Sequence, residues 1–391
     1  MLTSFAIIFL SGLLFSRICQ RLKLPGLIGM ILAGILVGPS VLNIIDASVL
    51  NIAASLRQFA LVLILTRAGL SLDIQALKKV GRPAFLMCFV PACFEVAGCV
   101  LIAPRLLPVN YTEAAIIGAV IAAVSPAVIV PRMIRLIEEG YGKEKSIPQL
   151  ILAGASVDDV FVIVLFTAFL ALEGNQKVSL WQFVTIPLSI ILGVAIGYLV
   201  ARLLIVLFEY VNLTTAQKLL VVLSSSFLMI ELENQLKGLV PISGLLAIMS
   251  IGLTFYQKKQ DMTKELSAKY NELWTAGEIL LFVLVGVAVN LSYVKTAGLM
   301  AIILVLVALC FRMAGVFLCV TGTKLDKRER LFCMLAYTPK ATVQAAIGAT
   351  PLAMGLRCGE TVLTVAILAI LITAPFGAIA IDRSYQKLLK Q

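Results

Sequence analysis

Two adjacent acids, Asp158 and Asp159, stand in the middle of an apolar stretch and are the residues best suited to chemistry in this sequence. Consecutive residues of a helix point about 100° apart, so one carboxylate can face a cavity while the other addresses a neighbouring helix. Burial and mutual repulsion both favour the protonated form of such a carboxylate. It can therefore hold a proton or a small cation, but not both, and this competition is sufficient for their exchange.

A hard monovalent cation prefers oxygen ligands. Asp158, Asp159, the Ser125 hydroxyl and backbone carbonyls at interrupted helices can supply them. We therefore predict a sodium site at Asp158 and Asp159, with Ser125 beside it. The chain has no histidine, which excludes an imidazole proton carrier, a histidine-ligated metal and a Ser-His-Asp triad. No cofactor is predicted.

Other charged residues also lie deep in apolar stretches, where each costs at least ~2.5–3.5 kcal/mol. Glu95 and Arg312 occupy the centres of two such stretches, and we predict an ion pair between them that leaves both aspartates free. The alternative places each in its own wet cavity. Lys340 follows a predicted helix break, where its charge would balance the partial charges of the helix ends. Arg67 lies near the end of its stretch and can snorkel to the interface.

Enzyme chemistry does not fit this pattern, so we predict a protein that is not an enzyme. Intramembrane aspartyl proteases need carboxylates on separate, facing helices, whereas adjacent residues diverge. Aspartate-rich prenyltransferases need a further acid at short spacing, but Val160, Phe161 and Val162 follow the pair.

The elements that position these charges are membrane spans. Of the 391 residues, 61% are hydrophobic and 14% are charged, and the mean hydropathy is +1.04, which is outside the range of soluble domains. Apolar stretches of about 20 residues recur along the chain, so we predict an all-α polytopic membrane protein without a soluble regulatory domain or a removable signal peptide. The thirteen predicted spans are residues 3–20, 26–45, 49–70, 83–104, 112–135, 148–172, 179–208, 214–232, 238–257, 271–293, 296–321, 330–354 and 359–381.

The distribution of lysine and arginine predicts the orientation. The odd-numbered loops and the C-terminal segment carry 23 of the 32 basic residues, the even-numbered loops carry 6, and 3 lie inside spans. Basic loops remain in the cytoplasm. We therefore predict a cell-membrane protein with a cytoplasmic C-terminus and an N-terminus outside.

The two halves of the chain resemble each other. Pro126 lies 100 residues after Gly26, and Pro339 lies 101 residues after Gly238, each preceded by a hydroxyl residue, Ser125 or Thr338. Proline removes a backbone donor. We predict two discontinuous helices, broken at Ser125-Pro126 and at Thr338-Pro339-Lys340, although a simple kink is the alternative. One domain, 1–391, then contains a repeat (1–172), a linking helix (179–208) and an inverted repeat (214–391).

At these residues the chain resembles the monovalent cation:proton antiporters, and within them the NHA branch of sodium/hydrogen antiporters. The segments that carry the resemblance are Leu24–Gly29 with Gly38-Pro39, Arg67–Leu70, Ser125–Pro131, Gly140–Gly142, Asp158-Asp159, Pro339–Ala346 and Ala374–Gly377.

The resemblance implies a thirteen-helix homodimer with a dimerisation domain and a mobile core around two crossed, broken helices. It implies that Asp159 is the main carrier of cation and proton, with Asp158 beside it. Many relatives have a lysine at the position of Arg312, paired with the first aspartate, whereas Glu95 is typical of the NHA branch. The partners so implied are Na⁺ (or Li⁺, K⁺), H⁺, lipid and a second copy of the chain, with no nucleic acid.

Three alternatives remain at this point. Potassium/proton exchange is a close variant of sodium/proton exchange. A sodium-coupled organic-anion symporter of the bile-acid type also has inverted repeats and broken helices, but adjacent aspartates would repel its substrate. A channel would need a selectivity filter or a gating-charge helix, and neither is recognisable in the sequence.

Overall fold

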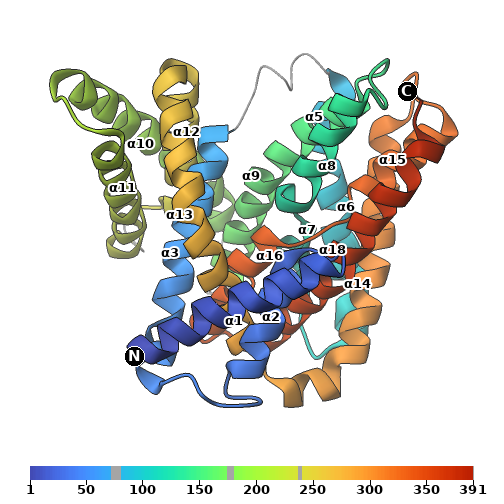
Figure 1. Cartoon of the computed structure of the whole chain (residues 1–391), viewed down its shortest axis with the longest axis horizontal. Coiled ribbons are helices and arrows are strands. Elements are labelled where there is room, and N and C mark those ends of the chain that lie inside the picture. The colour runs from blue at the N-terminus through green and yellow to red at the C-terminus, as the bar shows by residue number, and fades with distance from the viewer. Residues whose placement is uncertain (72–80, 174–179, 237–239, 391) are drawn as a thin grey trace. The chain divides into compact units, whose positions relative to one another are not determined.

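The computed structural model describes residues 1–71, 81–173, 180–236 and 240–390, and every regular element within them is an α-helix (Figure 1). The all-α prediction is confirmed. Some residues used in the sequence analysis lie outside the described ranges. They are Lys78, Lys79, Lys177 and Lys237, which were counted among the basic loop residues, residue 179 of the predicted linking span, and Gly238 and Leu239 at the start of the predicted span 238–257.

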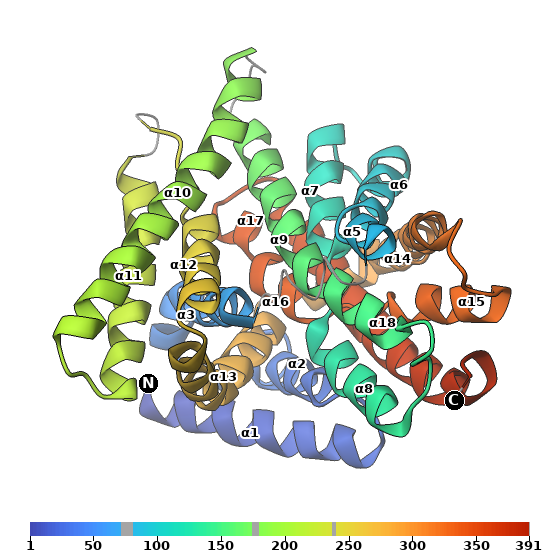
Figure 2. The ribbon, with the colours of Figure 1, turned by 90° about the horizontal axis from the view of Figure 1, so that it is seen from above.

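The helices divide between two compact units. The first unit comprises Met1–Arg57, Ile74–Val162 and Ile279–Gln391. Its helices are α1 (Leu2–Arg21), α2 (Gly26–Val37), α5 (Arg82–Met87), α6 (Val90–Leu106), α7 (Tyr111–Ala122), α8 (Pro126–Glu139), α14 (Leu291–Val320), α15 (Lys327–Ala336), α16 (Thr342–Ile347), α17 (Thr350–Ala353) and α18 (Gly359–Leu388). Within it α6 packs between α7 and α14, and α18 contacts α14, α15, α7 and α8 (Figure 2).

The second unit comprises Gln58–Asp73 and Ile163–Glu278. It contains α10 (Leu180–Tyr210), α11 (Thr215–Gln235) and α12 (Gly244–Lys258), with α12 packed against both of the others. The boundaries between the units fall inside α3 (Ala47–Ser71), α9 (Ile147–Glu173) and α13 (Gln260–Val287). All six residues of the predicted ion site and ion pair, including Lys340, belong to the first unit.

Ten helical segments in the described part of the chain are long and apolar enough to cross a membrane. Each coincides with a predicted span. The other three predicted spans, 26–45, 238–257 and 330–354, contain shorter helices. By helix length, therefore, the described residues give ten membrane crossings and not the predicted thirteen. For example, α2 has 12 residues, about 18 Å at 1.5 Å per residue, because the helix stops at Gly38-Pro39. The span predicted at 271–293 begins earlier, at Gln260, because α13 continues through a polar segment.

Both predicted helix breaks are present. Residues Ala123–Ser125 separate α7 from α8, and residues Tyr337–Ala341 separate α15 from α16. The backbone N–H of Ser125 donates to the carbonyl of Pro339 over 2.8 Å, so the two breaks meet directly. Free backbone groups are tolerated at membrane depth only where protein or water meets them, and here each break supplies a partner for the other.

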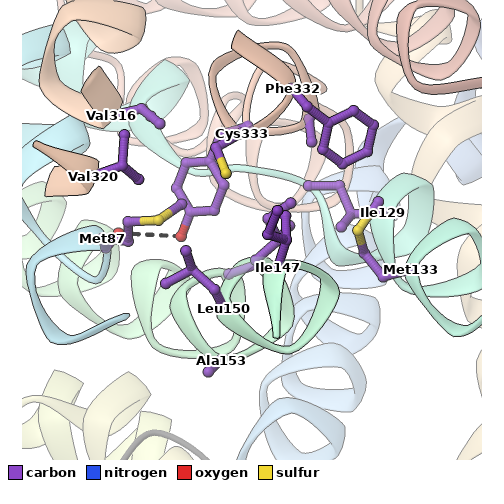
Figure 3. Close-up of a cluster of buried hydrophobic side chains, with 14 of the residues drawn as sticks. Met87, Ile129, Met133, Ile147, Leu150, Ala153, Val316, Val320, Phe332 and Cys333 are labelled. Atoms are coloured by element: carbon purple, nitrogen blue, oxygen red, sulfur yellow. Dashed lines mark hydrogen bonds between the residues drawn. The ribbon is translucent and has the colours of Figure 1, made fainter. Parts of the chain in front are cut away.

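A third break, which the sequence analysis missed, divides the predicted span 83–104 into α5 and α6 at Cys88-Phe89. Pro91 causes it, because proline cannot donate to the carbonyl four residues earlier, which belongs to Met87. The Tyr337 hydroxyl donates to this Met87 carbonyl instead, over 3.1 Å (Figure 3). A tyrosine at one helix break therefore satisfies the backbone at another.

A buried apolar cluster holds these interrupted elements in place (Figure 3). It joins Met87 of α5, Ile129 of α8, Leu150 of α9, Val316 of α14 and Phe332 of α15. Close packing of this kind resists displacement, because loss of contact has a dispersion cost at every atom. The cluster thereby fixes α9, which carries the two aspartates, against the helices that flank the breaks.

Candidate functional site

Asp158 and Asp159 lie near the middle of α9 and are both buried, with 0% and 8% of their surface exposed. Their environments differ. Asp158 Oδ2 accepts hydrogen bonds from the backbone N–H of Val124, over 2.8 Å, and from Arg312 Nη2, over 2.9 Å. Among the described residues, Asp159 has neither a hydrogen bond nor an ion pair. Adjacent residues of a helix point in different directions. Asp158 therefore reaches its two donors, whereas the Asp159 carboxylate reaches none in the described part of the chain.

Arg312 lies in the C-terminal third of α14 and is fully buried. Its Nη1 donates to Glu95 Oε2 over 3.0 Å and to the carbonyl of Ala122, its Nη2 to Asp158, and its Nε to the carbonyl of Tyr337 over 2.7 Å. The Ala122 carbonyl is the one that lost its helical donor to Pro126. One guanidinium therefore binds two carboxylates and caps the ends of two helices.

These contacts correct part of the sequence analysis. Glu95 and Arg312 lie in contact, but the pair does not leave both aspartates free, because Arg312 also binds Asp158. The guanidinium is a planar fork with five N–H donors, and it reaches acceptors on several sides at once. A lysine ammonium has no such fork, so the arginine at this position suits a site with four acceptors.

Lys340 also differs from its predicted role. Its Nζ donates to Glu95 Oε2 over 2.8 Å, while its backbone N–H donates to the Thr373 hydroxyl over 3.0 Å. The ammonium group thus pairs with a carboxylate instead of balancing the partial charges of the helix ends. Glu95, fully buried on α6, therefore accepts from both Arg312 and Lys340 through the same oxygen.

Gln344 completes the backbone contacts of the first break. Its Nε2 donates to the carbonyl of Ala123 over 2.8 Å and to that of Ile121 over 3.4 Å. Neither Gln344 nor Tyr337 received a role in the sequence analysis, although both lie in segments that the resemblance and the repeat include. The one feature of the sequence that could have indicated a role for them is that each is a polar residue close to a proline break at membrane depth.

Arg67 belongs to the second unit, whereas the charged residues described above belong to the first. It is half-buried and interacts electrostatically with Glu278 of α13, an acid at membrane depth that the sequence analysis overlooked. The sequence analysis predicted only that Arg67 snorkels to the interface and did not predict this acidic partner.

Several buried oxygen atoms of the cluster have no hydrogen-bond donor in the described part of the chain. They are Oδ1 of Asp158, Oδ1 of Asp159, Oγ of Ser125, Oε1 of Glu95 and Oε1 of Gln344. Buried acceptors without partners are costly, and a hard cation is the kind of ligand that relieves them. Within the described ranges, no three His, Cys, Asp or Glu residues are grouped so that they could hold a metal ion.

The chain is similar to known proteins of one family. The family described as "Sodium/hydrogen exchanger, transmembrane" matches residues 5–383. Sodium/hydrogen exchanger 9B2 of Homo sapiens is 33% identical over 390 residues, covering 94% of this chain and 70% of that protein. Sodium/hydrogen exchanger 9B1 of Homo sapiens is 32% identical over 404 residues, covering 95% and 75%.

Among solved structures, the sodium proton antiporter MjNhaP1 from Methanocaldococcus jannaschii has a similar fold. The TM-score is 0.84 with 20% sequence identity, and the match covers 100% of this chain and 99% of that one. At this identity the likeness concerns the fold alone.

The contacts of Arg312 generate a prediction for stability. Glu95→Gln and Arg312→Gln should each lower the free energy of unfolding in detergent, by about 3–5 kcal/mol for the loss of a buried charge partner. Arg312→Gln should cost more, because it also removes one of the two donors to Asp158 and the arginine donor to the carbonyls of Ala122 and Tyr337. In a double-mutant cycle the coupling should be about 0.5–3 kcal/mol. The exposed pair Lys269–Glu272 is the matched control, with coupling below about 1 kcal/mol; additive effects at Glu95 and Arg312 would contradict direct pairing.

Proposed function

Because this chain belongs to the transmembrane sodium/hydrogen exchanger family, we propose that it exchanges a monovalent cation, sodium or lithium, for protons by alternating access. The family is one of multi-pass membrane transporters and not of enzymes. The observation that carries the proposal is Asp159, a buried carboxylate with no partner in the described part of the chain, beside Asp158, whose Oδ2 is bonded to Arg312. Potassium/proton exchange is the close variant.

The proposed ion site consists of Asp159 Oδ1, Asp158 Oδ1 and the Ser125 hydroxyl, all buried oxygens without a donor in the described ranges. Carbonyls at the breaks around Pro126 and Thr338-Pro339 add further oxygens. A proton on Asp159 removes the negative charge that a cation needs, so the two ligands exclude each other. The organic-anion symporter is not favoured, because a carboxylate without a cationic partner would repel an anionic substrate.

The charges of the cluster also bear on the stoichiometry. Arg312 and Lys340 offset the charges of Glu95 and Asp158, to which they are bonded. Asp159 then contributes one uncompensated negative charge, which one proton or one monovalent cation neutralises. The site carries the same net charge in both loaded forms. We therefore infer a one-for-one, electroneutral exchange.

We also propose the domain organisation predicted from the sequence: repeats at 1–172 and 214–391 of opposite topology, a linking helix at 179–208, and a homodimer in the cell membrane. The paired breaks at Ser125-Pro126 and Thr338-Pro339, which meet through one backbone hydrogen bond, support two structurally equivalent halves.

Transport tests the role of Asp159. In proteoliposomes with an internal pH dye, sodium or lithium added outside should alkalinise the lumen with the parent protein, because the incoming cation displaces protons. Asp159→Asn should abolish this signal, since an amide neither carries a proton nor offers a negative charge. Asp261→Asn, at a fully exposed acid, is the control and should transport normally. If Asp159→Asn matched the parent, the assignment would be wrong.

Membrane voltage tests the stoichiometry. With diffusion potentials set by potassium and valinomycin in sodium-transport assays, we expect the same initial rate at zero and at inside-negative voltage, because no net charge crosses. A rate that depends on the sign of the voltage would refute one-for-one exchange and would indicate that a second proton is carried, with Lys340, whose ammonium group is bonded to Glu95, as the candidate carrier.

Orientation is tested by fusion of a green fluorescent protein after the last residue. The 23-to-6 distribution of basic residues predicts a cytoplasmic C-terminus, and hence a fluorescent fusion. A fusion of the same reporter before Met1 is the control and should remain dark if it is exported unfolded. Fluorescence of the N-terminal fusion alone would reverse the proposed orientation.

A further inference from the structure

An apolar groove of about 460 Å³ lies between α15 and α18, which pack against each other near the C-terminus (Figure 1). Its size is within the range of small-molecule sites, about 300–1,000 Å³. Leu331 and Leu335 of α15 form one wall, and Phe376, Ile379 and Ala380 of α18 form the other. Three of these side chains are strongly exposed, Leu331 by 42%, Phe376 by 49% and Ile379 by 39%.

The groove has a polar end. Arg383, Ser384 and Lys387 of α18 also line it, about two to three turns beyond Phe376. The α18 helix has 30 residues, about 45 Å, which exceeds the ~30 Å hydrocarbon core of a bilayer. Arg383 lies about 10 Å along the axis from Phe376. The lining therefore changes from apolar to cationic along the direction in which a bilayer changes from acyl chain to headgroup.

The cationic end is not neutralised by the protein. Arg383 and Lys387 are exposed, and neither has a hydrogen bond or ion pair within the described ranges. The neighbouring acid, Asp382, is bonded to Arg132 instead. The Ser384 Oγ is buried and also has no partner in the described part of the chain. Two unpaired cations and a free hydroxyl thus surround the mouth of an apolar groove.

We propose that this groove binds one anionic phospholipid, with an acyl chain between α15 and α18 and the phosphate on Arg383, Lys387 and the Ser384 hydroxyl. Charge complementarity favours an anionic over a zwitterionic headgroup, because basic side chains at a membrane surface attract anionic lipid. The apolar lining favours a lipid over a soluble phosphate, which would leave Phe376 and Ile379 uncovered. The site is distant in sequence from Asp158 and Asp159 and does not depend on the proposed transport.

A lipid in this groove would affect the packing of α15 and α18. α18 contacts α15, which ends at the second helix break, and α15 and α18 share the apolar cluster that fixes α9. A lipid wedged between α15 and α18 would fill the exposed side of this packing and brace the break that carries Lys340.

Native mass spectrometry of delipidated protein in detergent tests the proposal. Titration with phosphatidylglycerol should give one bound lipid at lower concentration than phosphatidylcholine, and soluble glycerol phosphate should not compete. The double variant Arg383→Gln, Lys387→Gln should weaken phosphatidylglycerol binding about 25-fold, at roughly fivefold for each charge. Ala380→Trp, which fills the groove, should abolish binding.

The matched control removes the same charge elsewhere. Arg21 and Lys23 are exposed at the end of α1, and Arg21→Gln, Lys23→Gln should retain parental binding. Equal binding of both lipids, or equal loss in the control and the Arg383, Lys387 variant, would overturn the proposal. It would also be wrong if Ala380→Trp left lipid binding unchanged but split an oligomer in size-exclusion chromatography, because the groove would then be a contact between two copies.

Discussion

The structure depends on one constraint, that backbone groups freed where helices are interrupted must find partners inside the membrane. Proline at positions 91, 126 and 339 removes helical donors, and the carbonyls affected are bonded by side chains instead. The Tyr337 hydroxyl donates to the carbonyl of Met87, and the Arg312 guanidinium donates to that of Ala122. The Thr338 hydroxyl donates to the carbonyl of Leu335 over 2.8 Å. Most of these donors come from a different helix or helix break. The backbone groups are therefore satisfied only when the helices are packed together.

The charges follow from this arrangement. A buried guanidinium that caps two helix ends needs anionic partners, because an unpaired buried charge costs several kcal/mol. Glu95 and Asp158 provide them, and Lys340 adds a second cation on Glu95. The structural network thereby engages every ionisable group of the cluster except Asp159. A carboxylate excluded from the network is available to a proton or a cation, and this availability is what exchange requires.

The same packing holds the interrupted helices together. The breaks divide long helices into short pieces, and the apolar cluster around Phe332 and Leu150 keeps the pieces of the first unit in contact. The α15 helix belongs to this cluster and ends at the second break. The lipid proposed between α15 and α18 would therefore contact a helix that leads into that break.

The sequence alone determined the membrane class, ten of the span positions, both broken helices and the depth of five charged residues that the structure buries, because these depend on local hydropathy, proline chemistry and the cost of a buried charge. It also indicated that Glu95 and Arg312 are partners. Only the tertiary structure decided how Arg312 divides its donors between Glu95 and Asp158, that Lys340 binds a carboxylate, and that Tyr337 and Gln344 close the breaks. Spacing along one helix specifies which face a side chain occupies, but hydrogen bonds across more than 150 residues of sequence depend on how the helices cross.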